Sequence, residues 1–374
     1  MIDAARRSQG LRKERTLASP RFADGVFRNA SGATPGLRRG STGGVLRDFL
    51  RGGSRRFPSS PLPSVSPLAG WSRRVDAPLR ATWLGHSTVL LELGGARVLT
   101  DPVWSNRASP VGFAGPRRFQ PVPVALDALP ALDAILVSHD HYDHLDRDAI
   151  CALARRGTPI CTSLGVGAHL EAWGIEPSRI VELDWWESFS PPTSGIRITA
   201  APSQHFSGRG LADRNRTLWS SFVIESDGAR AFFSGDTGLT REYSDIAARF
   251  GRFDLVMLEV GAFHPAWGHI HLGPDQALDA LGLLESKRLL PIHWGTFNLA
   301  IHDWDEPAER LVALAPERDV ELVMPRLGEV VVPTRVERVE PWWRTIDARE
   351  PCRDLDALDR DSTDEASLPE VTLD

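Results

Sequence analysis

A short stretch of histidines and aspartates, S-H-D-H-Y-D-H-L-D, constrains this chain more than any other. It follows the apolar run Ala134–Val137, which predicts a buried strand, so its polar side chains begin where a strand ends. A buried imidazole or carboxylate without a partner costs several kcal/mol, whereas a metal ion uses both as ligands. His139 and His141 leave an extended backbone on the same face, and Asp143 and His144 follow in a turn. The pattern H-x-H-x-D-H therefore favours a site for two metal ions over a solvated polar loop.

Three later strand-like segments also stop at a polar side chain. They are 196–201 followed by His205, 229–234 followed by Asp236, and 289–292 followed by His293. An isolated histidine after a strand is more often a hydrogen-bonded loop residue than a ligand. Three such events downstream of the first motif favour ligation.

The number of ligands suggests how they are divided between two ions. One ion receives His139, His141 and His205, the other receives Asp143, His144 and His293, and Asp236 bridges the two. Each ion then keeps a position for a shared water or hydroxide. The nitrogen-rich set favours two zinc ions per chain, and iron or manganese stays open as an alternative.

Four further residues have two interpretations from local sequence alone. Asp101 either accepts a hydrogen bond from a ligand imidazole or closes an Asx turn before Pro102. His86 either approaches the site or lies in a loop, and His264 and His269 are read as solvent-facing loop histidines.

Composition limits the remaining possibilities. With 374 residues, 42% of them hydrophobic, the chain can bury one large core or two ordinary ones. No apolar run is long enough to span a membrane, and the Arg-rich start lacks the apolar core of a secretory signal, so a cytoplasmic protein is expected. Three cysteines do not make a disulfide framework.

The chain divides into three parts by charge and pattern. Residues 1–76 carry 15 Lys and Arg against 5 Asp and Glu among many Gly, Ser and Pro residues, which predicts an extended basic arm, partly disordered, that supplies none of the proposed ligands. Residues 77–346 form the predicted catalytic domain. Residues 347–374 contain 10 acidic residues against 3 arginines and read as a disordered acidic tail.

Helical and strand patterns alternate throughout the middle part. Strands are predicted at 79–84, 88–93, 96–100, 134–137, 159–162, 179–183, 196–201, 219–225, 229–234, 255–260, 289–292 and 320–324, and helices at 146–155, 163–173, 240–250, 274–285 and 306–314. Two β-rich halves suggest an α/β (α+β) fold of two sheets packed face to face with helices outside.

Four motifs together resemble the metallo-β-lactamase superfamily. They are the stretch 138–146, Ser203-Gln204-His205, the segment 233–238 (F-S-G-D-T-G) and the segment 293–297 (H-W-G-T-F). Within that superfamily the chain looks like the N-acyl-phosphatidylethanolamine-hydrolysing phospholipase D branch, through L-T-D-P at 99–102, G-P-R-R-F at 115–119, L-D-W-W-E at 183–187 and Leu218-Trp219.

The resemblance implies an αββα sandwich of two mixed sheets, two zinc ions and phosphodiester hydrolysis that releases phosphatidic acid and an N-acylethanolamine. It gives the metal-ligand roles above to the same seven residues and places His271 in the active site. The loop 263–271 departs from the branch, which has an aromatic, Met- and Lys-containing loop there; its apolar character suits acyl chains.

The implied mechanism assigns two catalytic roles. Asp143 would orient the attacking hydroxide as well as bind metal, and His271 would polarise the substrate or protonate the leaving alcohol. A lactonase or other carboxylic-ester hydrolase of the same fold is the nearest alternative, and a non-catalytic protein that binds membrane or nucleic acid is the second. The expected partner is a small-molecule or phospholipid substrate, with peripheral membrane contact and a homodimer left open and no nucleic acid expected.

Overall fold

The computed structural model describes residues 2–34, 36, 55–192, 194–210, 212–264, 266–267 and 269–346, which form two mixed sheets packed face to face. In spatial order the first sheet is β16 (Val330–Val331), β3 (Leu79–Gly85), β4 (Thr88–Leu93), β5 (Ala96–Thr100), β6 (Ala134–Val137), β7 (Ile160–Ser163) and β8 (Ile180–Leu183). The second is β15 (Glu321–Leu322), β14 (Arg288–Ile292), β13 (Leu255–Glu259), β12 (Ala229–Phe233), β11 (Ser221–Ser226), β10 (Arg197–Ala201) and β9 (Ser188–Phe189).

Each sheet combines antiparallel hairpins with parallel strands. The strands β3, β4 and β5 form an antiparallel meander, in which Gly94 and Gly95 supply the positive φ angles of the tight turn. The strands β5 to β8 are parallel, and so are β12 to β15. Because parallel strands bring their carboxyl ends to one edge, the loops after β6, β12 and β14 lie along the same edge of the sandwich.

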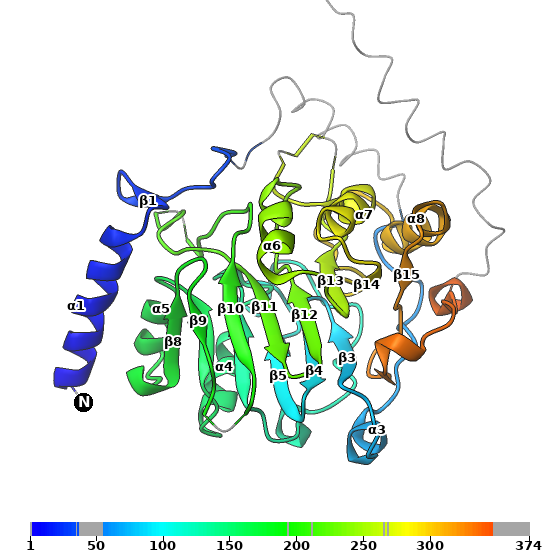
Figure 1. Ribbon diagram of the computed structural model, residues 1–374, viewed down its shortest axis with the longest axis horizontal. Coiled ribbons are helices and arrows are strands. Elements are labelled where there is room, and N and C mark those ends of the chain that lie inside the picture. The colour runs from blue at the N-terminus through cyan, green and yellow to red at the C-terminus, as the bar shows by residue number, and fades with distance from the viewer. Residues whose placement is uncertain are drawn as a thin grey trace, which may run out of the picture.

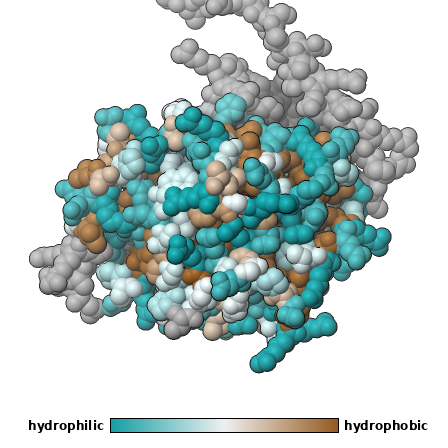
Figure 2. Space-filling model, viewed as in Figure 1, coloured by the Kyte–Doolittle hydropathy of each residue, from teal (hydrophilic) through white to brown (hydrophobic). Residues whose placement is uncertain are grey.

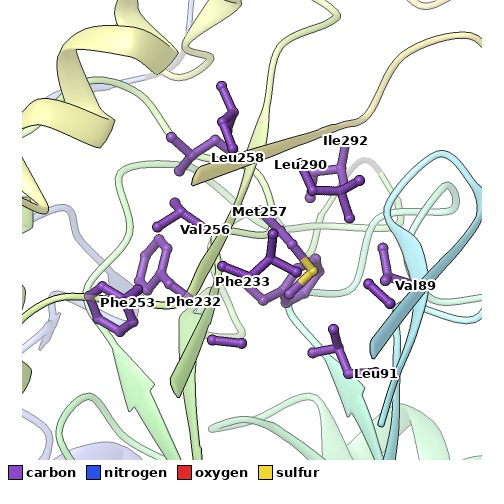
Figure 3. Close-up of a cluster of buried hydrophobic side chains, with 14 of the residues drawn as sticks. Val89, Leu91, Phe232, Phe233, Phe253, Val256, Met257, Leu258, Leu290 and Ile292 are labelled. Carbon is purple, nitrogen blue, oxygen red and sulfur yellow. The ribbon is translucent and has the colours of Figure 1, made fainter. Parts of the chain in front are cut away.

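The main hydrophobic core lies between the two sheets. Figure 3 shows Val89 and Leu91 of β4 facing Phe233 of β12 and Met257 of β13, and all four side chains are fully buried. These strands are rich in β-branched and aromatic residues, which pack well on a pleated surface. Their burial supplies the main favourable free energy of the fold.

Helices cover the outer faces of both sheets, as the alternating patterns predicted (Figure 1). The first sheet is covered by α4 (Arg147–Ala154) and α5 (Gly167–Ala172), and the second by α6 (Glu242–Phe250), α7 (Gly273–Leu283) and α8 (Glu306–Leu314). The Asp146 carboxylate begins α4 by accepting hydrogen bonds from the N–H groups of Asp148 and Ala149. The predicted αββα sandwich is confirmed.

Short elements complete the described chain. The helix α3 (Leu68–Ser72) packs through Trp71, and 3₁₀ turns occur at η1 (Leu126–Ala128), η2 (Pro177–Arg179), η3 (Ala315–Arg318), η4 (Pro333–Arg335) and η5 (Trp342–Thr345). The acidic tail 347–374 lies outside the described residues. Among the described helices, none is both long and apolar enough to cross a lipid bilayer. The face in Figure 2 is largely hydrophilic, with scattered apolar patches.

The predicted extended arm is wrong for the first part of the chain. Residues Ile2–Ala18 form the helix α1, which lies beside α5 and β8 at one side of the sandwich (Figure 1). The Arg12 guanidinium holds it there, with contacts of 2.7 Å to Glu171 and 2.6 Å to Glu182. A hairpin of β1 (Phe22–Ala23) and β2 (Val26–Phe27) follows and buries Phe27 completely. These ion pairs with distant residues therefore stabilise a helix whose sequence shows little amphipathic periodicity.

Candidate metal centre

The structure brings all seven predicted ligand side chains together at one edge of the sandwich. His139, His141, Asp143 and His144 follow β6 of the first sheet. The other three, His205, Asp236 and His293, follow β10, β12 and β14 of the second sheet. The site therefore lies on the seam between the sheets, where the strands end and the backbone is irregular.

Three imidazoles form the first group of donor atoms. His139 Nε2 lies 2.8 Å from His141 Nδ1, and His205 Nε2 lies 3.3 Å from the same Nδ1. All three donor atoms lie within 4.8 Å of one another. This is the set that the sequence assigned to one ion.

The second group gathers around the Asp143 carboxylate. Asp143 Oδ2 lies 3.3 Å from His293 Nε2 and 3.4 Å from His144 Nε2. His86 joins them, with its Nε2 3.1 Å from the same oxygen. The sequence left the place of His86 open, and the structure puts it inside this group.

His86 is best described as a support for Asp143. Burial and the neighbouring His293 lower its pKa to about 3, so its imidazole is neutral and donates a hydrogen to the ionised Asp143 carboxylate. The His86 backbone has a left-handed φ of 53°, held by a 2.7 Å hydrogen bond from its N–H to Thr296 Oγ1. Its carbonyl accepts the His293 N–H at 3.1 Å, so His86 links the two sheets directly under the site.

Asp236 lies between the two groups. Its Oδ1 is 3.1 Å from His144 Nε2, and its Oδ2 is 3.2 Å from His293 Nε2 and 3.7 Å from His205 Nε2. One carboxylate thus reaches nitrogens of both groups. The Asp236 side chain is almost completely buried.

The nitrogen and oxygen atoms of these side chains are arranged to bind divalent cations rather than to hydrogen-bond to one another. His144 Nε2 and Asp236 Oδ1 are buried and 3.1 Å apart, yet neither atom has a hydrogen bond in the described part of the chain. Buried polar atoms are almost always hydrogen-bonded, so a pair of orphaned atoms that face a cluster of imidazoles calls for a cation. Imidazole and carboxylate are the ligands that zinc and similar ions accept.

A buried network orients the ligands of the first loop. The Asp101 carboxylate is 2.6 Å from His144 Nδ1 and accepts a 2.7 Å hydrogen bond from Ser138 Oγ, which in turn is 2.9 Å from His139 Nδ1. Asp101 is fully buried and has a left-handed φ of 32°. It is therefore a partner of the ligand imidazoles, and such partners set ring orientation and metal affinity.

The N-terminal segment orients His205. Asn29 donates from Nδ2 to the His205 carbonyl at 2.8 Å and accepts the His205 N–H at 3.0 Å. Ser31 donates to the neighbouring Gln204 side chain. The ring is held from the other side, where its Nδ1 is 3.0 Å from the Ile270 carbonyl. The described part of this segment therefore holds the backbone of a candidate ligand.

The carboxylates control the protonation of the site. Burial disfavours the charged form of His293, but Asp236 and Asp143 outweigh it and raise the pKa of His293 to about 10. The same balance, with Asp236 the largest carboxylate contribution, raises the pKa of His144 well above its ordinary value. The pKa values of Asp143 and Asp236 are held well below the ordinary range, because the neighbouring imidazoles outweigh the cost of burial. In contrast, burial lowers the pKa of His139.

His271 lies at the border of the site. Its ring centroid is 5.0 Å from that of His205 and 5.7 Å from that of His293. Burial, followed by His293 and His144, lowers its pKa to about 4. Its Nδ1 is 2.7 Å from the Glu259 carboxylate, a residue that the sequence analysis missed because it reads as the last residue of an apolar strand.

The other loop histidines stay outside the ligand groups. His264 Nδ1 accepts the Ala266 N–H at 3.1 Å, and the His269 carbonyl accepts a 2.6 Å hydrogen bond from Gln204. Neither side chain belongs to a described cluster of potential ligands. Both therefore contribute to the loop rather than to the centre.

A narrow cleft borders the second group. Its wall contains His293 together with the aromatic and aliphatic side chains of Phe119, Phe297, Leu299 and Trp304. Arg118 packs its guanidinium 4.8 Å from the centre of the Phe297 ring and donates to the Val103 carbonyl at 2.6 Å. The volume of the cleft, about 10 Å³, is enough for about one water molecule.

Known proteins resemble this chain in sequence and in structure. Residues 96–294 match the family described as β-lactamase superfamily domain. An uncharacterized protein of Mycobacterium tuberculosis is 46% identical over 332 residues, covering 87% of this chain and 88% of that protein. N-acyl-phosphatidylethanolamine-hydrolyzing phospholipase D 1 of Caenorhabditis elegans is 38% identical over 271 residues, covering 68% and 76%. Igni18, a metallo hydrolase of the archaeon Ignicoccus hospitalis, has a solved structure that aligns with a TM-score of 0.51 at 22% identity, covering 68% of this chain and 97% of that one.

Proposed function

The chain belongs to the metallo-β-lactamase superfamily as a metal-dependent hydrolase, and we propose that it hydrolyses phosphodiesters of phospholipid type at a dinuclear zinc centre. The single observation that carries the dinuclear assignment is the Asp236 carboxylate, which reaches nitrogens of both imidazole groups. Zinc is the proposed metal because five imidazoles and two carboxylates make a nitrogen-rich set.

One comparison favours a lipid phosphodiester. The C. elegans relative is named for hydrolysing N-acyl-phosphatidylethanolamine and is 38% identical to this chain. The cleft beside His293 is too small for an acyl chain, so the hydrocarbon part of such a substrate would lie outside it.

The protein's own residues divide the chemistry. Bound cations supply Lewis acidity toward phosphoryl oxygens and make a water nucleophilic near neutral pH. Asp143, held by His86 at 3.1 Å, orients that water toward the phosphorus. The His271 ring, whose pKa is lowered to about 4, is neutral near pH 7. It would accept the proton that the attacking water loses as the new P–O bond forms, and pass it to the leaving alcohol oxygen as the old P–O bond breaks.

Peripheral contact with a membrane would bring such a substrate to the site. The loop before Arg118 has paired ends at Arg107 and Arg117 and carries Phe113, whose side chain is 85% exposed, and Val111. Arg118 itself pairs with Phe297 in the cleft wall. We propose that the Phe113 loop enters the headgroup region beside the cleft, since exposed apolar side chains flanked by cations suit an anionic lipid surface.

A substrate panel tests the proposed function. Zinc-loaded protein is assayed with N-acyl-phosphatidylethanolamine, a nitrophenyl phosphodiester, lactones and thioesters, and the Asp236→Ala variant is the control. We expect metal-dependent release of phosphatidic acid, with a higher kcat/KM for the diesters than for any lactone or thioester. Preference for a lactone would assign a carbonyl electrophile instead, and a metal-loaded protein inactive on the whole panel would favour a binding protein.

A further inference from the structure

We propose that Glu259 is a positioning residue, which holds His271 so that its Nε2 faces the substrate. This inference rests on the proposed function, because it gives His271 its orientation as the proton donor to the leaving group. Glu259 is the last residue of β13, between the strands that lead to Asp236 and His293. Its side chain is completely buried directly beneath the metal centre.

Both oxygens of the Glu259 carboxylate have assigned partners. Oε1 accepts the backbone N–H of Thr237, the residue after Asp236. Oε2 is 2.7 Å from His271 Nδ1. Whichever of these two atoms holds the shared hydrogen, Nδ1 is occupied, and Nε2 is the ring nitrogen that can exchange a proton with a substrate.

The energetic cost of Glu259 points to a role beyond packing. A carboxyl group without exposure to water costs several kcal/mol unless it is paired. No lysine or arginine among the described residues pairs with Glu259; its only ion-pair partner there is His271. An apolar residue would suit the end of this buried strand better, since Leu255, Val256, Met257 and Leu258 before it are all apolar and buried. The need to orient His271 explains why a carboxylate occupies this buried position.

Metal ligation is the alternative role for Glu259. Donor atoms of Asp236, Glu259 and His293 lie within 4.8 Å of one another, so the carboxylate is close enough to be considered. However, the Thr237 N–H and the His271 ring already use both of its oxygens. Metal content, measured together with the catalytic effect of His271, therefore distinguishes ligation from positioning.

A double-mutant cycle separates positioning from general structural damage. Glu259→Gln keeps the shape of the side chain but replaces the carboxyl group by an amide. It is compared in the wild-type and His271→Ala backgrounds on a diester with an alkyl leaving group. Second-sphere partners typically contribute 10–100-fold, so we expect Glu259→Gln to lower kcat by about that factor in the wild type. In the His271→Ala background it should have almost no further effect. Equal losses in both backgrounds would overturn the proposal.

The leaving group supplies a second readout within the same cycle. With a nitrophenyl leaving group, which needs no proton, the loss caused by Glu259→Gln should shrink to a few-fold, in parallel with His271→Ala. Glu242→Gln is the matched control, because Glu242 is mostly buried on α6 and its carboxylate accepts a hydrogen bond from Thr240. Zinc content should stay unchanged in Glu259→Gln. A parallel loss of zinc would make Glu259 a ligand and overturn the positioning role.

A measurement on the ring itself does not depend on the substrate. In ¹⁵N-histidine-labelled, zinc-loaded protein, the His271 signals are assigned by their loss in His271→Ala. We expect a hydrogen on Nδ1 that exchanges slowly in the wild type and rapidly in Glu259→Gln, with Glu259→Asp as a second variant if the first fails to fold. An unchanged Nδ1 signal would refute the proposal, whereas a changed signal with no diester hydrolysis would refute only the proposed function.

Discussion

At the scale of single residues, the Asp236 carboxylate determines how the site is divided. It lies within 3.7 Å of nitrogens from His144, His205 and His293, which belong to both proposed ion sites. The donor atoms of His139, His141 and His205 form one group, and those around Asp143 form the other. Substitutions at Asp236 and at a single-site ligand should therefore differ in their effect.

Replacing Asp236 by Ala should weaken both ion sites, whereas His293→Ala should mainly empty the second. Elemental analysis after metal-replete expression should find about two zinc ions in the wild type, about one in His293→Ala, and fewer than one in Asp236→Ala. The reason is that Asp236 lies close to nitrogens of both groups, whereas His293 belongs to the second group, beside Asp143. One ion or none in the wild type would contradict the dinuclear assignment.

Metal uptake should release protons at neutral pH. In the metal-free protein the pKa of His293 is raised to about 10, and that of His144 well above its ordinary value, so both rings carry two hydrogens at pH 7. A ligand nitrogen must lose its proton, so we expect release of about two protons per chain and an affinity that rises with pH until His293 is neutral near pH 10. Calorimetric titration of zinc in buffers of different ionisation enthalpy measures this release, and its absence would contradict the raised pKa values.

At the scale of elements, the segment from α1 to β2 is part of the support for the site. It is attached by Arg12 to Glu171 and Glu182 and by Asn29 to His205. These contacts join residues far apart in the sequence. Substitutions in an arm that only lies on the surface would leave the site unchanged. Substitutions in this segment should alter the site.

Asn29→Ala should destabilise the protein and loosen the ion bound by His205. Asn29 is buried, and its removal takes away the hydrogen-bond partner that it offers to the N–H and to the carbonyl of His205, at a cost of about 1–3 kcal/mol. Thermal unfolding and competition with a chromophoric chelator measure the two effects. Arg28→Ala, whose side chain is 56% exposed, is the control and should match the wild type. Equal behaviour of the two variants would argue against the support role.

Phe113→Ser should weaken binding to phospholipid vesicles without altering turnover of a soluble diester. Phe113 is 85% exposed, and burying an aromatic side chain in the membrane interface is worth about 1.5–3 kcal/mol, so a drop of at least about tenfold in vesicle affinity is expected. Co-sedimentation with anionic vesicles measures it. Leu283→Ser, a 37% exposed position on α7, serves as the matched control. Unchanged vesicle binding would exclude this loop as the contact.

At the scale of the whole molecule, the centre joins the two sheets. His139 follows β6 of the first sheet, whereas His205 follows β10 of the second. A cation bound between them connects halves of the sandwich that otherwise meet through the hydrophobic core. Metal binding should therefore contribute to global stability as well as to catalysis.

Removal of metal should lower the melting temperature by at least about 5 °C. A ligand that binds only the folded state at a hundred times its Kd stabilises by about 2.7 kcal/mol, and each kcal/mol corresponds to about 2–4 °C for a domain of this size class. Differential scanning calorimetry with and without EDTA measures the shift, and added zinc should restore it. The Asp236→Ala variant should show little response to EDTA. A wild-type shift within error would mean that the metals do not stabilise the fold.

Local patterns predicted the sandwich well, because its strands and helices carry their own signals. Ala96–Thr100 and Glu306–Leu314 have the predicted bounds. The candidate ligands His205, Asp236 and His293 were predicted because each follows a strand-like segment. The helix α1 was missed, since its partners Glu171 and Glu182 lie more than 150 residues away and no amphipathic period marks it. Glu259 was missed for the same reason. Its role depends on His271, which only the tertiary fold places beside it.

The position of α1 has a consequence for behaviour at high concentration. The strand β8 is the outermost strand of the first sheet, and its backbone would otherwise be open to pairing with another chain. Arg15 of α1 donates a 2.8 Å hydrogen bond to the Glu182 carbonyl of β8, and Arg12 binds the Glu182 side chain. The helix thereby blocks edge-to-edge aggregation at β8, so a chain that loses it would become prone to assemble into β-linked aggregates.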